Sequence, residues 1–540
     1  MEGKIIKVGE KAQSKIIEGV VKAVDAIKTT LGPAGKGVAL DTGLGVDITR
    51  DGATVAKTIK FSDREMNMGA ELVRKAAENT ENLVGDGTSS VSILIKELCL
   101  RGQKAVSTGA NVNEVKSGMI KTQRWLTEYI KKNSIEVGSD LEKIRKVATI
   151  SANNDPEIGN LVVKGLEKVG INGLLTADMA SGLDTIVDVT DGMKLDRGWA
   201  SPQFITNPED GTCILENPYI LVVGETLSTI PQIVNFFEDF QKHGEGRPLL
   251  IVCDDIDESI NTMLIFNTIQ GALKCCVVKG IDYGDARKNI MEDLAVAVGA
   301  NHLCPENGVS MTQAKVGDLG QASRVVINRD SCIIYEGMGD KDMIQDRAAV
   351  IKARLEDPLT TDYDKTKFEK RLANLIGGIA IIKAGGASEA EKQNKKATIE
   401  DSILASKSAI SEGCVPGGGY VYFLAADAIV KDKAFWKTLS GDEVEGANIV
   451  VKSLPIIMKT IIDNCGESSD VIMSKVRSYK GKDNIGFNAK TKKIENLVDG
   501  GVLDSSEVLR VSLENSISTA SMILLIDCTI IDEEESNKKE

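Results

Sequence analysis

The order of helical and strand-rich segments is the feature that most constrains the fold of this chain. Residues 16–27 repeat apolar side chains at helical spacing, and Leu31-Gly32-Pro33 then ends that helix. From about residue 191 to 377, short β-rich runs alternate with helical segments, which favours α/β layers. After Gly377-Gly378 the pattern returns to long amphipathic helices. This order predicts that one domain is inserted into another, whose first and last parts pack together.

Individual strands and helices can be predicted in the middle section, residues 191–377. Its expected strands are Tyr219–Val223, Pro248–Cys253, Cys275–Val278, Arg324–Ile327 and Cys332–Tyr335, and its expected helices are Ile230–Phe240 and Ile260–Ile269. The end of the chain, Asp532 to Glu540, is nearly all charged or polar, and we expect it to be disordered.

The composition excludes several classes of function. A net charge of −14 argues against a nucleic-acid partner, because phosphate binding needs clustered Lys and Arg. No run approaches the roughly 18 apolar residues of a membrane span, and the first residues lack the apolar block of a secretory signal and the Arg/Ser-rich composition of an organelle presequence. The two histidines, His243 and His302, leave little room for zinc-hydrolase chemistry. The ten cysteines include no C-x-x-C pair, which favours buried thiols in a reducing compartment over a disulfide or zinc framework.

The segment Gly85-Asp86-Gly87-Thr88-Ser89-Ser90 is the sharpest local signal of a binding site. Its glycines let the backbone approach a ligand, and its hydroxyls lie where the following helix leaves N–H groups unpaired, a geometry that binds anions. A carboxylate beside phosphate is repulsive unless a divalent cation bridges them, so Asp86 predicts Mg²⁺ shared with phosphate oxygens. The alternative interpretation is an ordinary helix start with Asp86 or Thr88 as the N-cap.

Similar small-residue turns occur at Thr30–Pro33, Arg50–Thr54 and Gly417–Gly419. The chain contains neither G-x-x-x-x-G-K-[ST] nor a G-x-G-x-x-G that opens a βα unit, which excludes a P-loop ATPase and a dinucleotide-binding fold. A nucleotide site would therefore have to be assembled from several distant turns. With so few histidines, carboxylates and a bound metal would have to carry any chemistry.

A set of motifs runs through nearly the whole chain, from about residue 4 to about 530. The motifs are Thr30–Pro33, Gly85–Ser90, Ile150–Asn153, Asp196-Arg197-Gly198 with Ser201-Pro202, Asp318–Gln321 with Arg324–Asn328, Lys395-Lys396 with Glu400-Asp401, Gly417–Gly419 and Asn464–Glu467. In order and spacing this set resembles the GroEL-type (group I) chaperonins, the sixty-kilodalton chaperonin family. The resemblance implies a multidomain fold with nested, discontinuous domains, in which the equatorial domain is mainly α and the apical domain is α/β.

The resemblance also implies the domain boundaries and the activity. The equatorial domain would comprise 1–134 and 412–540, the intermediate domain 135–190 and 380–411, and the apical domain 191–379. The protein is expected to capture non-native polypeptides on its apical domain and to enclose them in a ring cavity for folding. ATP hydrolysis with Mg²⁺ would drive this cycle, and K⁺ is a further candidate ion.

Carried over residue by residue, the resemblance implies a nucleotide site. Asp401 would activate the hydrolytic water with help from Asp51, and Asp86 would hold Mg²⁺. Asn488 and Ala489 would lie near the base and Asp504 on the ribose. The full set expected to bind the nucleotide is Thr30, Leu31, Gly32, Pro33, Arg50, Asp86, Gly87, Thr88, Ser89, Ser90, Gly418, Asn488, Ala489 and Asp504.

An apical groove for polypeptides and a GroES-like co-chaperonin is implied in the same way. Its expected lining is Trp199, Gln203, Phe204, Val234, Phe237, Asn261, Ile265 and Phe266. The alternative is that these apolar stripes are buried core. The sequence departs from the family pattern at several places: Gln203 and Asn261 replace an aromatic and an aliphatic residue, Arg50 a Lys, Ser89 and Ser90 threonines, and Lys490 a small residue.

Two further interpretations compete with the group I resemblance. The archaeal and cytosolic chaperonins share a similar Gly-Asp-Gly-Thr loop but carry a built-in lid, for which the short step from His243 to Pro248 leaves no room. A separate co-chaperonin is therefore implied. The resemblance to the group I chaperonins also implies homo-oligomeric rings of seven subunits, in a reducing compartment such as a bacterial cytoplasm or a mitochondrial-type matrix. A non-hydrolysing ring scaffold or peptide-binding module is the alternative of another class, and the intact Asp51, Asp86 and Asp401 argue against it.

Overall fold

The structure is a computed structural model that describes residues 4–41, 45–171, 173–208, 210–282, 284–355, 357, 362–479 and 484–532. The chain forms two compact units: unit 1 comprises Met1–Val163 and Ala387–Glu540, and unit 2 comprises Lys164–Gly386. Unit 2 is thus a continuous segment inserted into unit 1, as the order of segments predicts. The acidic end of the chain that we expect to be disordered lies, from residue 533 on, outside the described residues.

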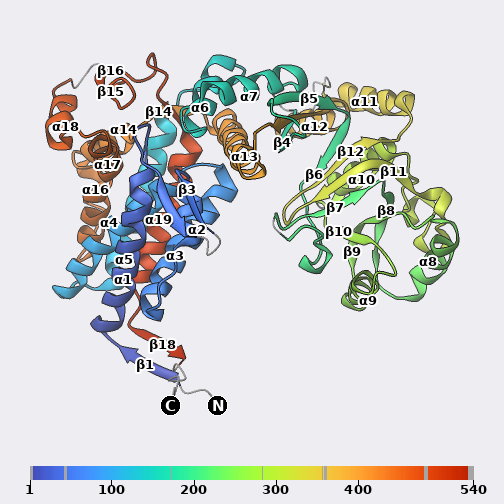
Figure 1. Ribbon diagram of the computed structural model, residues 1–540, viewed down its shortest axis with the longest axis horizontal. Coiled ribbons are helices and arrows are strands. Elements are labelled where there is room, and N and C mark those ends of the chain that lie inside the picture. The colour runs from blue at the N-terminus through green and yellow to red at the C-terminus, as the bar shows by residue number, and fades with distance from the viewer. Residues whose placement is uncertain are drawn as a thin grey trace. The chain divides into compact units, whose positions relative to one another are not determined.

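Unit 1 is mainly helical and draws on both ends of the chain (Figure 1). Its helices are α1 (Glu10–Ile27), α2 (Gly52–Thr58), α3 (Arg64–Val84), α4 (Thr88–Ser107), α5 (Val112–Lys132), α6 (Leu141–Ser151), α13 (Glu389–Glu412), α14 (Tyr420–Ile429), α15 (Lys433–Trp436), α16 (Glu443–Ser453), α17 (Ile456–Asn464), α18 (Ser469–Ser478) and α19 (Ser506–Leu524), and the chain leaves the unit within α7 (Pro156–Val169). Its strands pair two by two: β1 (Lys4–Val8) with β18 (Cys528–Asp532), β2 (Val38–Asp41) with β3 (Val46–Thr49), β14 (Cys414–Pro416) with β17 (Leu503–Ser505), and β15 (Ile485–Asn488) with β16 (Lys493–Asn496).

Helix α19 joins the two parts of unit 1. It packs against α3, α4 and α5 from the first part of the chain, and Leu513, Ile517 and Ile523 are among its fully buried side chains. These residues share one apolar core with Ile16 to Ile27 on α1, where the periodic stripe predicts a buried helix face. The nested arrangement is therefore held by a single core rather than by the strand pairs.

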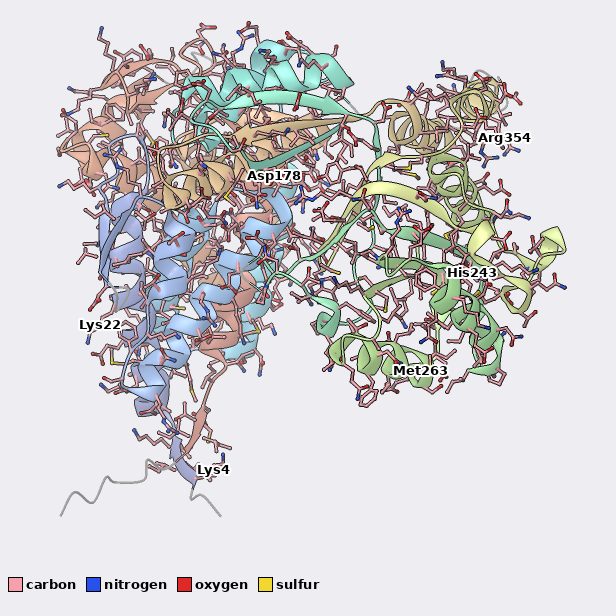
Figure 2. All side chains as sticks on the ribbon, turned by 45° about the vertical axis from the view of Figure 1, so that its right-hand side comes forward. Lys4, Lys22, Asp178, His243, Met263 and Arg354 are labelled. Atoms are coloured by element: carbon pink, nitrogen blue, oxygen red, sulfur yellow. The ribbon has the colours of Figure 1, made fainter. Side chains whose placement is uncertain are left out.

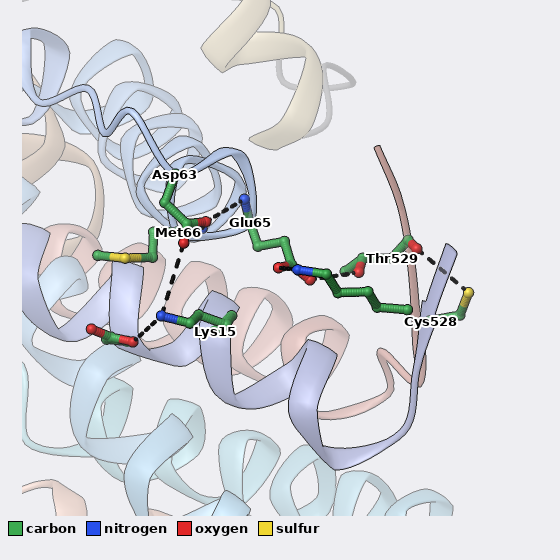
Figure 3. A network of polar contacts seen from close by, with 8 residues as sticks. Lys15, Asp63, Glu65, Met66, Cys528 and Thr529 are labelled. Atoms are coloured by element: carbon green, nitrogen blue, oxygen red, sulfur yellow. Dashed lines mark hydrogen bonds and ion pairs between the residues drawn. The ribbon is translucent and has the colours of Figure 1, made fainter. Parts of the chain in front are cut away.

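A buried carboxylate ties both chain ends to this core (Figure 3). Glu65, in the first turn of α3, is 2% exposed, and its Oε1 accepts a hydrogen bond from the Thr529 hydroxyl on β18 at 2.9 Å. Its Oε2 pairs with the Lys7 ammonium on β1. Because an isolated two-stranded ribbon is only marginally stable in water, this carboxylate anchors the β1–β18 pair.

Unit 2 is an α/β unit built on a seven-stranded sheet of order β10-β9-β8-β11-β12-β6, in which β7 also pairs with β11. The parallel strands β8, β9 and β10 are joined by α8 and α9, as short crossovers require. Ala200, in the segment that follows β6, donates to the Val277 carbonyl on β10 at 2.7 Å, so an isolated bridge links this segment to the other edge of the sheet. These elements are β6 (Gly192–Leu195), β7 (Cys213–Glu216), β8 (Tyr219–Leu227), α8 (Pro231–His243), β9 (Leu249–Ile256), α9 (Glu258–Ile269), β10 (Cys275–Lys279), α10 (Gly284–Val298), β11 (Gly320–Ile327) and β12 (Cys332–Gly337).

A smaller sheet of order β4-β13-β5 completes unit 2, with α11 and α12 beside α10. These elements are β4 (Leu174–Met179), β5 (Ile186–Thr190), α11 (Lys341–Leu355), α12 (Asp362–Ile376) and β13 (Ile379–Ala384). Every strand and helix predicted for the middle section is confirmed, most of them with longer bounds. All ten cysteines are free, and nine of them are buried, which confirms the prediction of unbridged thiols. No helix among the described residues is long and apolar enough to cross a membrane.

Substituting Glu65→Leu should release the terminal ribbon. The substitution leaves Lys7 and Thr529 without their buried partner, so the backbone amides of β1 and β18 should exchange at least tenfold faster in hydrogen–deuterium exchange. The control is Glu18→Gln, which removes exposed ion pairs to Lys15 and Lys22 on α1 and should leave the ribbon protected. Unchanged protection in Glu65→Leu would show that strand pairing alone holds the chain ends.

Candidate functional site

A cavity of about 400 Å³ in unit 1 brings together all the residues predicted for the nucleotide site. This volume is in the range of small-molecule sites, roughly 300–1,000 Å³. The predicted residues that line it are Thr30, Leu31, Gly32, Pro33, Arg50, Asp51, Asp86, Gly87, Thr88, Ser89, Ser90, Asp401, Gly418, Asn488, Ala489 and Asp504. They come from turns far apart in the sequence, as the absence of a single phosphate-binding motif requires.

The loop between α3 and α4 begins a helix without a side-chain cap. Gly87 is the N-cap residue, with φ 87°, and among the described residues no side chain bonds to the first N–H groups of α4. The one bond that Asp86 accepts within the described ranges comes from the Gly87 amide, at 2.5 Å, so neither Asp86 nor Thr88 caps the helix and the alternative interpretation is wrong. The unpaired N–H groups and the positive end of the α4 dipole are therefore available to an anion.

The turn at Thr30 lies beside this loop. The Thr30 hydroxyl is 3.3 Å from the Ser89 hydroxyl, and the Asn464 side-chain amide donates to the carbonyls of Lys28 and Leu31 at 3.0 and 2.9 Å. Asn464 belongs to one of the motifs that carry the chaperonin resemblance, and these two bonds explain why an asparagine is needed at this position. They hold the turn against the C-terminal end of α17.

Asp401 reaches the cavity because α13 packs directly on the loop glycine. A Cβ atom at Gly85 would lie 2.4 Å from Cβ of Leu404 and 2.7 Å from the carbonyl oxygen of Asp401, and the φ of Gly85 is +68°. Only glycine fits there. Burial raises the pKa of Asp401 well above its ordinary value, and the negative charges of Glu81, Asp51 and Asp86 add to the shift.

Asp51 has a local role that the sequence did not indicate. It is the N-cap of α2, where its carboxylate accepts the amides of Ala53 and Thr54 at 3.2 and 2.7 Å and the Thr54 hydroxyl at 2.6 Å. These bonds fix the carboxylate at the edge of the cavity. Asp51 therefore faces Asp401 as an oriented negative charge.

Two further carboxylates lie at the floor. Burial raises the pKa of Asp86 to about 6, with Asp51 adding to the shift, and raises that of Asp504 to about 7, with Asp86 adding. Asp504 accepts the Gly418 amide at 3.2 Å. No group of three or more His, Cys, Asp or Glu side chains in the described part of the chain could hold a metal ion alone. Asp86 and Asp504 line the cavity with carboxylate oxygens, which are the donors that Mg²⁺ prefers.

Several residues that line the cavity were not among the predicted set. The hydroxyls of Ser151 and Ser512 are buried and have no hydrogen-bond partner among the described residues, so the cavity offers them to a ligand. Arg145 and Lys146 on α6 add positive charge, and the Lys146 ammonium donates to the Val498 carbonyl at 3.0 Å. The motif Ile150–Asn153 marked this region without indicating a role, and nothing in the sequence around Ser512 singles it out.

A second cavity, of about 370 Å³, lies between α8 and α9 in unit 2 and contains part of the predicted groove. Val234 and Phe237 line it, and Phe266 on α9 is 58% exposed. Figure 2 labels Met263 on α9 and His243 at the end of α8, which identify the two helices among the side chains. Phe204 and Ile265, predicted to line the groove, are instead buried in the core of the unit at 1% and 9% exposure.

Three residues of the predicted groove, Trp199, Gln203 and Asn261, have side chains with polar atoms, and they differ in exposure and in hydrogen bonding. Trp199 is half-buried, and its Nε1 donates to the Gly211 carbonyl at 3.3 Å. Gln203 is exposed, and its Oε1 accepts the Ser201 hydroxyl at 3.0 Å. Asn261 is half-buried, and its Oδ1 has no hydrogen-bond partner in the described ranges. Asn261 thus carries an uncompensated polar atom beside an apolar surface.

Solved structures share this architecture. The chaperonin gp146 from the bacteriophage EL 2 (Pseudomonas aeruginosa), in presence of ATP-BeFx, matches in crystal form II with a TM-score of 0.75 and 19% identity, over 98% of this chain and 100% of that one. Crystal form I matches with a TM-score of 0.65 and 20% identity, over 98% and 99%. The fold is therefore a chaperonin fold, with a mainly helical unit and an α/β unit, as predicted.

The family follows from the sequence itself. Residues 24–237 and 240–534 match the model of the TCP-1/cpn60 chaperonin family. The chain belongs to this family, and the predicted resemblance to chaperonins is confirmed.

Substituting Asp504→Asn should stabilise the ligand-free protein more at pH 8 than at pH 5. The pKa of about 7 in the folded state exceeds the ordinary value of 3.8, so ionisation of Asp504 costs stability increasingly as the pH rises from 4 to 7 and fully above 7. The gain at pH 8 should exceed the gain at pH 5 by roughly 2–3 kcal/mol, seen as a higher thermal unfolding midpoint. The exposed Asp499→Asn should show no such difference, and an equal effect of Asp504→Asn at both pH values would contradict this account.

Proposed function

We propose that this chaperonin subunit hydrolyses ATP and uses the cycle to capture non-native polypeptides and enclose them in a ring cavity. The single observation that carries the proposal is the position of Asp401, buried beside the loop Gly85–Ser90 and facing Asp51 and Asp86. Outside a reactive site, so many carboxylates in one cavity would only reduce stability. The gp146 structures, which share this fold, were determined in the presence of ATP-BeFx, and this supports a nucleotide as the ligand.

Each group in the cavity has a task in hydrolysis. The N–H groups at the start of α4 and the hydroxyls of Thr88, Ser89 and Ser90 bind phosphate oxygens. Asp86 would hold Mg²⁺, and K⁺ is a further candidate ion. When bound, the divalent cation neutralises charge on the phosphates.

Asp401 acts as the general base. Because burial raises the pKa of Asp401 above its ordinary value, its carboxylate is the stronger base. It takes the proton from the water that attacks the γ-phosphate, and ADP and phosphate leave. Asp51, held by the N-terminus of α2, keeps the orientation of that water. At the other end of the cavity, Ala489 and Asn488 would contact the nucleotide's purine base, and Asp504 would contact its ribose. The Asn488 side chain is held in place by a hydrogen bond to Glu495.

Unit 2 contains the segment that we propose as the apical domain, which would bind polypeptides and the co-chaperonin. Helix α8 ends at His243 and β9 begins at Leu249, so no helical insertion interrupts this connection. A separate GroES-like co-chaperonin would then close the cavity, in rings of seven identical subunits. We propose the three-domain division, 1–134 with 412–540, 135–190 with 380–411, and 191–379, as the bodies that move when nucleotide binds.

Asp401→Ala tests the catalytic proposal. The variant should bind Mg-ATP with near wild-type affinity by calorimetry but hydrolyse it about 10²–10⁴-fold more slowly, because a positioned base is lost. The neighbouring Glu400→Ala is the control and should keep most of its turnover. Turnover of Asp401→Ala within threefold of wild type would reject the assignment, and a wild type that binds ATP without hydrolysing it would favour the non-hydrolysing scaffold.

The groove is tested by two substitutions of opposite effect. Phe237→Glu should sharply weaken binding of a denatured apolar client, because it places a charge on the apolar wall. Asn261→Leu should tighten binding, since covering an unpaired amide costs roughly 1–3 kcal/mol. Binding can be followed by fluorescence anisotropy of a labelled client. Equal affinities of wild type and Phe237→Glu would remove the groove from the mechanism.

A further inference from the structure

Two cations lie together at one end of the groove between α8 and α9. Arg247 follows α8 and precedes β9, and Lys274 follows α9 and precedes β10. The Leu249 amide donates to the Lys274 carbonyl at 2.8 Å, so the two segments run side by side. Both residues line the same cavity as the apolar side chains of Val234 and Phe237.

The Arg247 guanidinium is held in one orientation. Its Nε donates to the Asn217 carbonyl at 2.8 Å, its Nη1 donates to Gln321 Oε1 at 3.0 Å, and its Cζ lies 4.2 Å from the centre of the Tyr219 ring. Its Nη2 has no partner among the described residues. A guanidinium whose orientation is fixed in advance loses little entropy when its free edge binds a carboxylate.

Neither cation is neutralised by the protein. Across the described ranges, Arg247 and Lys274 form no ion pair with a carboxylate, although the chain as a whole has a net charge of −14. Glu238 is the only acidic residue in the described lining of this cavity, and the other polar lining residues, Gln241 and Asn267, are neutral. Two unit charges also outweigh the partial negative charge at the C-terminal ends of α8 and α9. This end of the groove therefore attracts anions.

We propose that the groove selects polypeptide segments in which apolar residues are followed by acidic side chains. The apolar side chains would pack between α8 and α9, and an Asp or Glu carboxylate would pair with Arg247 and Lys274. This proposal rests on the proposed function, because it assumes that the groove binds polypeptides. It adds a charge preference that an apolar groove alone does not have.

Fluorescence anisotropy with three labelled peptides tests the preference. The peptides share one apolar core and end in two Glu, two Gln or two Lys residues, with an amidated C-terminus. Wild type at low salt should bind the Glu peptide about tenfold more tightly than the Gln peptide and the Lys peptide most weakly. The preference should shrink as ionic strength rises.

Three variants locate the preference. Lys274→Gln should reduce the ratio of Glu-peptide to Gln-peptide affinity to about threefold. Arg247→Lys keeps the positive charge but removes the planar guanidinium that can bind a carboxylate through two N–H groups, and it should reduce the ratio partly. Lys242→Gln removes an exposed cation of α8 that does not line the cavity, and it should leave the ratio unchanged.

The outcomes separate this proposal from the groove itself. If wild type binds the Gln peptide but shows no preference for Glu, or if the preference survives in both Lys274→Gln and Arg247→Lys, the charge selection is wrong. If wild type binds none of the peptides, the groove assignment fails as well. If the Gln peptide binds equally to wild type and Phe237→Glu, the binding lies elsewhere on the chain.

Discussion

The burial of α19 between α3, α4 and α5 is the interaction on which the rest of unit 1 depends. This helix comes from the last tenth of the sequence, yet it fills the centre of a core that the first part of the chain begins. Asp504 lies just before it and Thr529 just after it, so its insertion carries one residue to the Gly85–Ser90 loop and the other to Glu65. The cavity and the terminal ribbon are consequences of one packing event.

The cavity is electrostatically unfavourable without a ligand. Desolvation raises the pKa of Asp86, Asp401 and Asp504, and the charge of Asp86 raises the pKa of the other two further. The hydroxyls of Ser151 and Ser512 are left without partners among the described residues. Each feature costs folding free energy, and their concentration in one place is typical of a site that is completed by what it binds. Phosphate, metal and nucleoside together would supply the missing charges and acceptors. Stability is thus traded for a prearranged binding site.

Much of the fold could be predicted because periodicity reports which residues are buried. The stripe on α1 and the β-rich runs of unit 2 were found in this way, and the motifs located the nucleotide-site residues that the cavity brings together. Helix α9 shows the limit: apolar residues occur on most of its surface, so no pattern distinguishes the buried Ile265 from the exposed Phe266. Arg145 and Lys146 were not predicted from the sequence, because Lys146 contacts the distant Val498 and no local pattern marks that contact. Contacts between remote segments carry no local signal.

The route of the chain through its two units also sets the order in which they can be completed during synthesis. Unit 2 is continuous from Lys164 to Gly386, so all of it is synthesised before α13 and well before α19. Unit 1 begins first and is finished last, because β1 must wait for β18 before it gains a neighbour. In the interval, α3 and α4 expose the apolar surface that α19 later covers. A protein of the chaperonin family is therefore itself a nascent chain with a long-exposed apolar face, and its own biogenesis calls for the kind of protection that chaperones provide.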